Sequence, residues 1–123
     1  MDFWQVLEAR YSVRRFDPAT DVPPETVERI LQAAIRAPSA GNRQEWRFVV
    51  VQDAETRRKL MDAANGQSFV GQAPVVVAAC AEGEQHVMTC GQLSYPIDVA
   101  IALEHLALAA TAEGLGTCWI GAF

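Results

Sequence analysis

The 123-residue sequence is half hydrophobic and one-fifth charged, which is typical of one globular domain built around a single core. A formal net charge of −5 argues against a nucleic-acid-binding protein, because such proteins carry an excess of lysine and arginine. No apolar run approaches the length that a bilayer requires, and the first residues lack the basic and apolar regions of a signal peptide. The sequence therefore predicts a single domain over residues 1–123 in a cytoplasmic protein.

The basic residues are confined to the first half of the chain. All ten lie between Arg10 and Lys59, whereas residues 60–123 contain six acidic residues and no lysine or arginine. An anionic ligand would therefore be held mainly by the first half, unless a second chain contributes. The cysteines and histidines lack the spacing of metal ligands, so we predict no metal site and expect the cysteines to be small buried hydrophobes. These residues are Cys80, Cys90, Cys118, His86 and His105.

A helix is predicted over residues 2–9, and a strongly basic segment at 10–16 follows it directly. This segment holds three arginines and a serine. In an extended chain Arg10, Ser12 and Arg14 would point to one face and offer an anion two guanidinium groups and a hydroxyl. The alternative for the same residues is a solvated basic turn without a ligand.

Proline residues delimit the next elements. A second helix is predicted from Pro24 to just before Pro38, with apolar residues at the spacing of a half-buried helix. Residues 37–46 form a loop of small and amide-bearing residues, which leads into a β-branched strand at 47–51.

A third helix is predicted to open at Asp53 and to end at Asn65. It carries a basic run at 57–59, which we expect to be a solvated helix face. Residues 75–80 form a continuous apolar run, which is typical of a central strand buried on both faces.

Residues 82–95 show no clear period and are expected to form a loop or a short helix. A long helix is predicted over 97–113, and it is apolar nearly all round. Such a helix is either a core helix or one shared with a partner subunit, and we expect it to be too polar and too short to span a membrane. A strand is predicted at 117–121.

Three segments together resemble motifs of the nitroreductase family. They are residues 10–16 (RYSVRRF), 37–46 (APSAGNRQEW) and 114–121 (GLGTCWIG). Members of this family are FMN enzymes that reduce small acceptors, such as nitroaromatics or quinones, with NADH or NADPH. The resemblance implies an α+β fold with a central, mostly antiparallel sheet flanked by helices, in an intertwined homodimer with two flavins at the subunit interface.

The resemblance also implies which residues bind the flavin. Arg10 and Ser12 would contact the phosphate and ribityl chain, and Arg14 would lie nearer the pyrimidine edge of the ring. The 37–46 loop would reach the flavin of the opposite subunit, Gln67 would reach the pyrimidine, and the residues after Cys118 would line the ring near its reactive nitrogen. The implied cofactor-binding residues are Arg10, Tyr11, Ser12, Arg14, Pro38, Ser39, Ala40, Asn42, Gln67, Trp119, Ile120, Gly121 and Ala122.

Elementary chemistry is compatible with these roles. A phosphate requires charge-assisted donors, and a guanidinium beside the N1–C2 edge of the ring would favour the negative charge that reduction brings there. The small residues 39–41 would let the backbone approach a flat ring closely. No catalytic side chain is expected, because the flavin itself carries electrons between the two substrates in a ping-pong cycle.

Two features depart from the family pattern. Glu45 stands where the family usually has proline before the tryptophan. The sequence also stops at Phe123, whereas relatives usually continue through a further strand and helix that bring a late basic residue to the phosphate. We therefore expect that the C-terminal part of the family fold is missing; otherwise the phosphate would depend on Arg10 and its neighbours alone.

Other functions remain open at this stage. They are a flavin-binding module without turnover, a dehalogenase or cofactor-synthesis enzyme of the same family, and a structural α+β dimer with no cofactor. Flavin absorbance and its bleaching by NADH or NADPH would separate these alternatives from a reductase.

Overall fold

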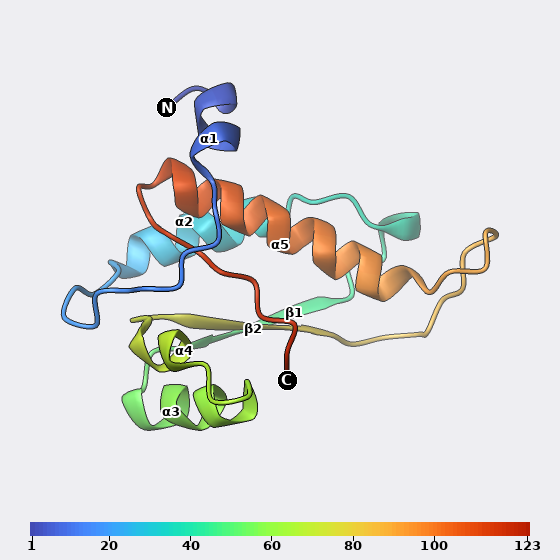
Figure 1. Cartoon of the computed structure of the whole chain (residues 1–123). Coiled ribbons are helices and arrows are strands. Elements are labelled where there is room, and N and C mark those ends of the chain that lie inside the picture. Colours follow the sequence, from blue (N-terminus) through green and yellow to red (C-terminus); the bar gives the residue numbers. More distant parts are fainter.

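The computed structural model describes residues 1–123, and its two strands form one antiparallel sheet (Figure 1). Strand β1 (Trp46–Val51) pairs with β2 (Val76–Ala81), with Trp46 opposite Ala81 and Val51 opposite Val76. Both strands are rich in valine, whose branched side chain suits a pleated surface. The strands predicted at 47–51 and 75–80 are confirmed to within one residue.

Helices lie on both faces of this sheet (Figure 1). On one face the long helix α5 (Ser94–Ala112) packs beside α2 (Pro24–Ala34), and the short α1 (Phe3–Ala9) packs on α5. On the other face α3 (Ala54–Ala63) and α4 (Ser68–Gln72) pack on each other. The predicted α+β class is confirmed.

Side-chain caps determine where two of the helices begin. Asp2 accepts a hydrogen bond from the N–H of Gln5, and the Gln5 side chain accepts one from the N–H of Asp2, both at 2.9 Å, which is a reciprocal capping box. Asp53 accepts the hydroxyl and the N–H of Thr56, at 2.6 and 2.8 Å. These two bonds lower the pKa of the Asp53 carboxyl and start α3.

The sequence does not predict α4, because this short helix depends on a contact with α3. The Arg57 guanidinium donates to the carbonyls of Gly71 at 3.0 Å and Ala73 at 2.6 Å, at the C-terminal end of α4. Such bonds satisfy carbonyls that a helix end leaves unpaired. Arg57 is consequently partly buried, so the expectation of a fully solvated basic run at 57–59 was wrong for this residue.

Two expectations about strands are corrected by the structure. In the predicted strand at 117–121, only Thr117 makes a bridge, with Ser12, and the residues after it have no strand partner. β2 is not buried on both faces, since the first four of its residues are partly buried and its last two are exposed. A sheet of two strands leaves each strand with an open edge, which explains this exposure.

The cysteine prediction was also wrong. Cys80 and Cys90 are exposed, and Cys118 is only partly buried. Cys80 belongs to the exposed end of β2, and Cys90 lies in the connection between β2 and α5. The structure brings no three His, Cys, Asp or Glu side chains together as ligands for a metal ion.

Helix α5 begins three residues earlier than predicted because Pro96 falls in its first turn, where a backbone N–H has no intrahelical partner. By length and composition alone the helix could cross a membrane, with a mean hydropathy of 1.2, contrary to the expectation from the sequence. In this fold it is the central helix, in contact with α1, α2 and both strands.

The core is centred where α5 faces β1. Trp46 is 6% exposed and packs with two small buried residues, Ala37 and Ala102, which let the indole lie close to the helix. Partly buried Phe48, Val99 and Ile101 surround this cluster. The tryptophan therefore joins the loop before β1, the strand itself and α5.

An ion pair joins α2 to the residue that follows α5. Arg29 Nε and Nη2 donate to the two carboxylate oxygens of Glu113, at 2.8 and 2.7 Å. These bonds lower the pKa of Glu113 below its ordinary value of 4.5 and raise the pKa of Arg29. Both side chains remain partly exposed, so water and salt screen the pair.

Glu113→Gln is expected to make the free energy of unfolding depend less on pH in the acid range. The folded-state pKa of Glu113 lies below its unfolded value, so the pair stabilises the fold above pH 4.5 and this contribution is lost as the pH falls further. Urea unfolding of wild type and variant from about pH 7 to about pH 3 measures the effect. The difference between them should shrink on acidification, whereas Glu104→Gln, at an exposed position of α5, should show no such change.

Candidate functional site

The arginine segment and the segment after α5 lie side by side, although they come from opposite ends of the chain. The N–H of Val13 donates to the carbonyl of Thr117 at 2.8 Å, and Ser12 forms a parallel bridge with Thr117. In Figure 1 these blue and red segments meet below the C-terminal half of α5. Two of the three sequence motifs are thereby brought together.

Three guanidinium groups at this place have no partner within the chain. Arg10, which is the C-cap of α1, is partly buried, whereas Arg14 and Arg15 are exposed. None of the three belongs to an ion pair, unlike Arg29 and Arg47. Unpaired guanidinium groups beside a serine hydroxyl are suited to bind a phosphate or another anion.

Gly116 allows the two segments to approach. A Cβ atom on Gly116 would lie 2.6 Å from Cγ2 and 3.1 Å from Cβ of Val13. Valine is branched at Cβ and has few rotamers with which to move away. The site geometry therefore requires glycine at this position for steric reasons.

Gly116→Ala is expected to lower the free energy of unfolding by about 1–3 kcal/mol, the usual cost of overpacking. Val13→Ala removes the γ-carbon clash, so the double variant should lose less stability than the two single variants together. Urea unfolding of the three variants measures this coupling. Gly121→Ala is a matched control, because no atom lies within 4 Å of a Cβ there; equal losses at both glycines would contradict the assignment.

The loop before β1 contains a 3-10 turn, η1 (Ala40–Asn42), and an unusual backbone. Gly41, Asn42 and Gln44 have φ angles of 58°, 55° and 52°. Residues other than glycine seldom adopt this left-handed region, and when they do the position is often functional. The Ser39 hydroxyl oxygen accepts the N–H of Gln44 at 3.0 Å, which closes the loop on itself.

A carboxylate from α5 holds the same loop from outside. Asp98 Oδ1 accepts the N–H of Ala40 at 3.1 Å, and the Asp98 residue is only 4% exposed. Its Oδ2 has no partner, and neither has the hydroxyl of Ser94, which lies one turn earlier and is fully buried. The sequence marks Asp98 only as a polar interruption of an apolar helix, which is the one signal that could have identified it.

The other predicted residues near the arginine segment are largely open to solvent. Tyr11 is 67% exposed and Trp119 is 56% exposed. Within the segment that follows, Ile120 is partly buried, and Gly121 and Ala122 are exposed. Tyr11 and Trp119 are thus exposed aromatic side chains on the two segments that the Ser12–Thr117 bridge joins.

Gln67 and Pro38 are placed on other elements. Gln67 is the N-cap residue of α4, and its side-chain amide donates to the carbonyl of Ala64 at 3.0 Å. Pro38 is exposed at the start of the η1 loop. The amide of Gln67 therefore makes a local bond in this structure.

A sequence profile of the nitroreductase family matches residues 7–89 and 62–123, which together include nearly the whole chain. The chain belongs to the nitroreductase family. It is similar to an NADH dehydrogenase of Thermus thermophilus, with 45% identity over 71% of this chain and 42% of that protein. It also resembles a nitroreductase family protein of Clostridium novyi NT, with a TM-score of 0.89 and 35% identity over 100% of this chain and 71% of that one.

A further solved relative is an FMN-dependent nitroreductase of Clostridium difficile R20291, with a TM-score of 0.82 and 32% identity over 94% of this chain and 64% of that one. The nitroreductase fold expected from the three motifs is thus confirmed. The chain spans 67%, 42% and 62% of the length of three curated relatives, so it corresponds to part of what those proteins contain.

In this nitroreductase-family chain most of the predicted flavin-binding residues form two separate groups, and Gln67 lies apart from both at the start of α4. The η1 loop is bonded to Asp98 near the N-terminal end of α5, and the helix axis extends about 20 Å from there to Ala112. Ser12 pairs with Thr117, and in Figure 1 the blue segment after α1 and the red segment after α5 meet below the C-terminal half of this helix. In one copy of the chain, the arginine segment and the η1 loop therefore lie toward different ends of α5.

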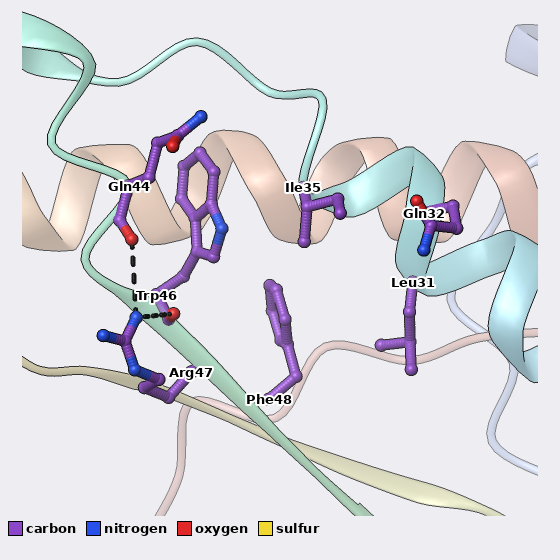
Figure 2. Close-up of a pocket in the computed structure, with 7 residues that line it drawn as sticks. All are labelled: Leu31, Gln32, Ile35, Gln44, Trp46, Arg47 and Phe48. Carbon is purple, nitrogen blue, oxygen red and sulfur yellow. Dashed lines mark hydrogen bonds between the residues drawn. The ribbon is translucent and has the colours of Figure 1, made fainter.

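A hollow of about 490 Å³ lies between α2 and β1 and contains none of the predicted flavin-binding residues (Figure 2). Its Arg47 guanidinium folds back on the carbonyls of Trp46 and Gln44, at 2.7 and 3.5 Å. Motif comparison follows continuous segments, so it does not reveal a hollow made by a helix, a loop and a strand. The lining residues are Leu31, Gln32, Ile35, Gln44, Trp46, Arg47 and Phe48.

Proposed function

We propose that the protein is an FMN-dependent oxidoreductase that takes electrons from NADH or NADPH and delivers them to a small acceptor such as a nitroaromatic or a quinone. The observation that carries this proposal is the pairing of Val13 with Thr117, beside three guanidinium groups that have no partner of their own. FMN, when bound, would supply the hydride and electron transfer, so the protein's task is binding, orientation and electrostatics.

Each group in the arginine segment has a distinct task in this proposal. Arg10 and Ser12 bind the phosphate, because a fork of N–H donors and a hydroxyl match its oxygens. Arg14 lies at the pyrimidine edge, where its fixed positive charge makes reduction more favourable. The exposed Trp119 and the backbone after it support the ring and restrict water.

The second half-site comes from another copy in this proposal. Ser39, Ala40 and Asn42 on the η1 loop would contact the flavin held by the arginine segment of the partner copy. The two half-sites lie toward different ends of α5, which supports assembly of each site from two chains. Gln67 would contribute once its amide exchanges the bond to Ala64 for one to the pyrimidine.

The exposed area of a single copy supports a homodimer. The chain exposes 7,821 Å², whereas a compact monomer of 13.4 kDa exposes about 6,500 Å². The excess of roughly 1,300 Å² is larger than the approximately 800 Å² that each partner buries in a standard interface. A single copy therefore has enough uncovered surface for a stable dimer.

Helix α5 is incompletely covered by its own chain. Only 22% of an 18-residue apolar stretch within α5 is buried, and Ile97 remains 42% exposed. A helix that is apolar all round is normally covered on every side. A second copy packed on α5 would provide the missing cover. The residues that α5 does bury against its own chain are small or polar, namely Ser94, Asp98, Ala102, Ala110 and Thr111.

Absorbance of the purified protein tests the proposed function. Flavin bands should be present, or should form with added FMN, and they should bleach when NADH or NADPH is added without oxygen. Bands that do not bleach would identify a flavin-binding module without turnover. An absence of binding after FMN supplementation would overturn the proposal.

Light scattering during size exclusion tests the dimer and should give twice the mass of the chain. A cytoplasmic location belongs to the same proposal, because that compartment supplies both nicotinamide cofactors. A monomer at micromolar concentration that still binds FMN would contradict the two-chain site.

A further inference from the structure

We infer that Asp98 is a positioning residue that sets the η1 loop for flavin binding, an inference that rests on the proposed function. Asp98 belongs to α5 and reaches the loop through one hydrogen bond, from the N–H of Ala40 to Oδ1 at 3.1 Å. It is absent from the residues that the family motifs point to. Its task is to fix the backbone from which Ser39 and Asn42 act.

The loop needs an external support because its conformation is costly. Asn42 and Gln44 have left-handed φ angles, which for residues other than glycine must be held by surrounding contacts. The Ser39–Gln44 bond closes the loop but does not attach it to the rest of the fold. The Ala40–Asp98 bond makes that attachment to the central helix.

The burial of Asp98 makes the loss of this hydrogen bond costly. The residue is 4% exposed, and Ala40 N–H is the only donor that its carboxylate has in the chain. A buried carboxylate without a donor is unfavourable, and so is a buried N–H without an acceptor. Both groups therefore gain from keeping Ala40 in place.

Ser94 offers a matched control on the same face of α5. Its hydroxyl lies one turn before Asp98, is fully buried and makes no hydrogen bond. Ser94→Ala removes a polar atom from the same surroundings without touching the loop. A difference between the Asp98 and Ser94 variants consequently reports on the bond to Ala40.

Ala40→Pro removes the other partner of the bond. Ser39 has φ −143° and ψ 154°, which suits a residue that precedes proline, and proline is accepted at the first position of a helix. The ring leaves the carboxylate of Asp98 without its donor in the single variant. In the Asp98→Ala, Ala40→Pro double variant, neither partner is left unsatisfied.

The experiment measures FMN affinity of the apoprotein by quenching of flavin fluorescence, for the full chain and its variants. Asp98→Ala should weaken binding about tenfold, and Ser94→Ala less than about twofold. Asp98→Asn keeps an acceptor oxygen and should restore most of the affinity. The double variant should lose less affinity than the two single variants lose together, because both substitutions remove the same bond, and a fully additive loss would contradict the inference.

Hydrogen exchange of the amides of residues 40–44 in the apoprotein is a readout that needs no flavin. It should be faster in Asp98→Ala than in Ser94→Ala, with little change elsewhere. Unchanged FMN affinity in Asp98→Ala, or unchanged exchange of these amides, would overturn the inference. If Asp98→Ala does not fold, Ala40→Pro and Asp98→Asn decide the same question.

The two proposals fail in different ways. A wild-type chain that binds no FMN would overturn the proposed function, and loop exchange would still show whether Asp98 orders the loop. If Asp98→Ala binds FMN as tightly as the wild-type chain does, the proposed function stands and the role of Asp98 is overturned.

Discussion

Trp46→Ala is expected to lower the free energy of unfolding by about 3–5 kcal/mol, the largest stability loss expected among the single substitutions considered. Trp46 is 6% exposed and joins the loop, β1 and α5 through Ala37 and Ala102. Alanine at this position leaves a cavity between small neighbours that have no side chain with which to fill it. For a domain of this size the loss corresponds to a fall of roughly 10–20 °C in Tm.

The other two tryptophans provide controls for this prediction. Trp4 and Trp119 are 71% and 56% exposed, so their replacement by alanine should change stability little. Calorimetry of the three variants at one protein concentration makes the comparison, because Tm of a dimer depends on concentration. A Trp46 variant as stable as the Trp119 variant would contradict the core described above.

Arg10→Ala is expected to weaken FMN binding about 10- to 100-fold. A hydrogen bond to a charged group contributes about 1.5–3 kcal/mol, and no lysine or arginine after Lys59 can replace this one within the chain. Fluorescence titration of the apoprotein with FMN measures the loss. Arg10→Lys should have an intermediate effect, because it keeps the charge but not the planar fork.

Arg15→Ala and Arg58→Ala separate a specific contact from general attraction. Both side chains are exposed, make no ion pair and carry the same charge as Arg10. Each should weaken binding far less than Arg10→Ala does. Three equal losses would mean that net charge alone attracts the flavin, and an unchanged affinity in Arg10→Ala would remove its phosphate role.

Elements with strong local signals were predicted well from the sequence. The valine-rich strands and the helices begun by Asp2, Pro24 and Asp53 carry their own propensities and caps, so local rules suffice. α4 was missed because the bonds from Arg57 that support it come from another helix. The strand at 117–121 failed for the same reason, since a strand forms only where a neighbour is present to pair with it.

The candidate site shows the same division. The motifs that carry Arg10, Ser12 and Pro38 are continuous in sequence and therefore visible there. The bond from Asp98 to the loop joins distant positions, and its only local sign is that Asp98 interrupts an otherwise apolar helix. The exposure of Cys80 and of β2 likewise follows from the number of strands in the sheet, which no short segment specifies.

On the proposed function, the pairing of Val13 with Thr117 sets the earliest point during synthesis at which the chain can bind flavin. Contacts between distant positions close large loops and form late, whereas β1, β2 and the helices between them need only nearby residues. The arginines leave the ribosome early but have no neighbouring segment until Thr117 has followed. On the proposed function, flavin capture cannot precede the synthesis of that threonine, and it reports that the chain has been made at least that far.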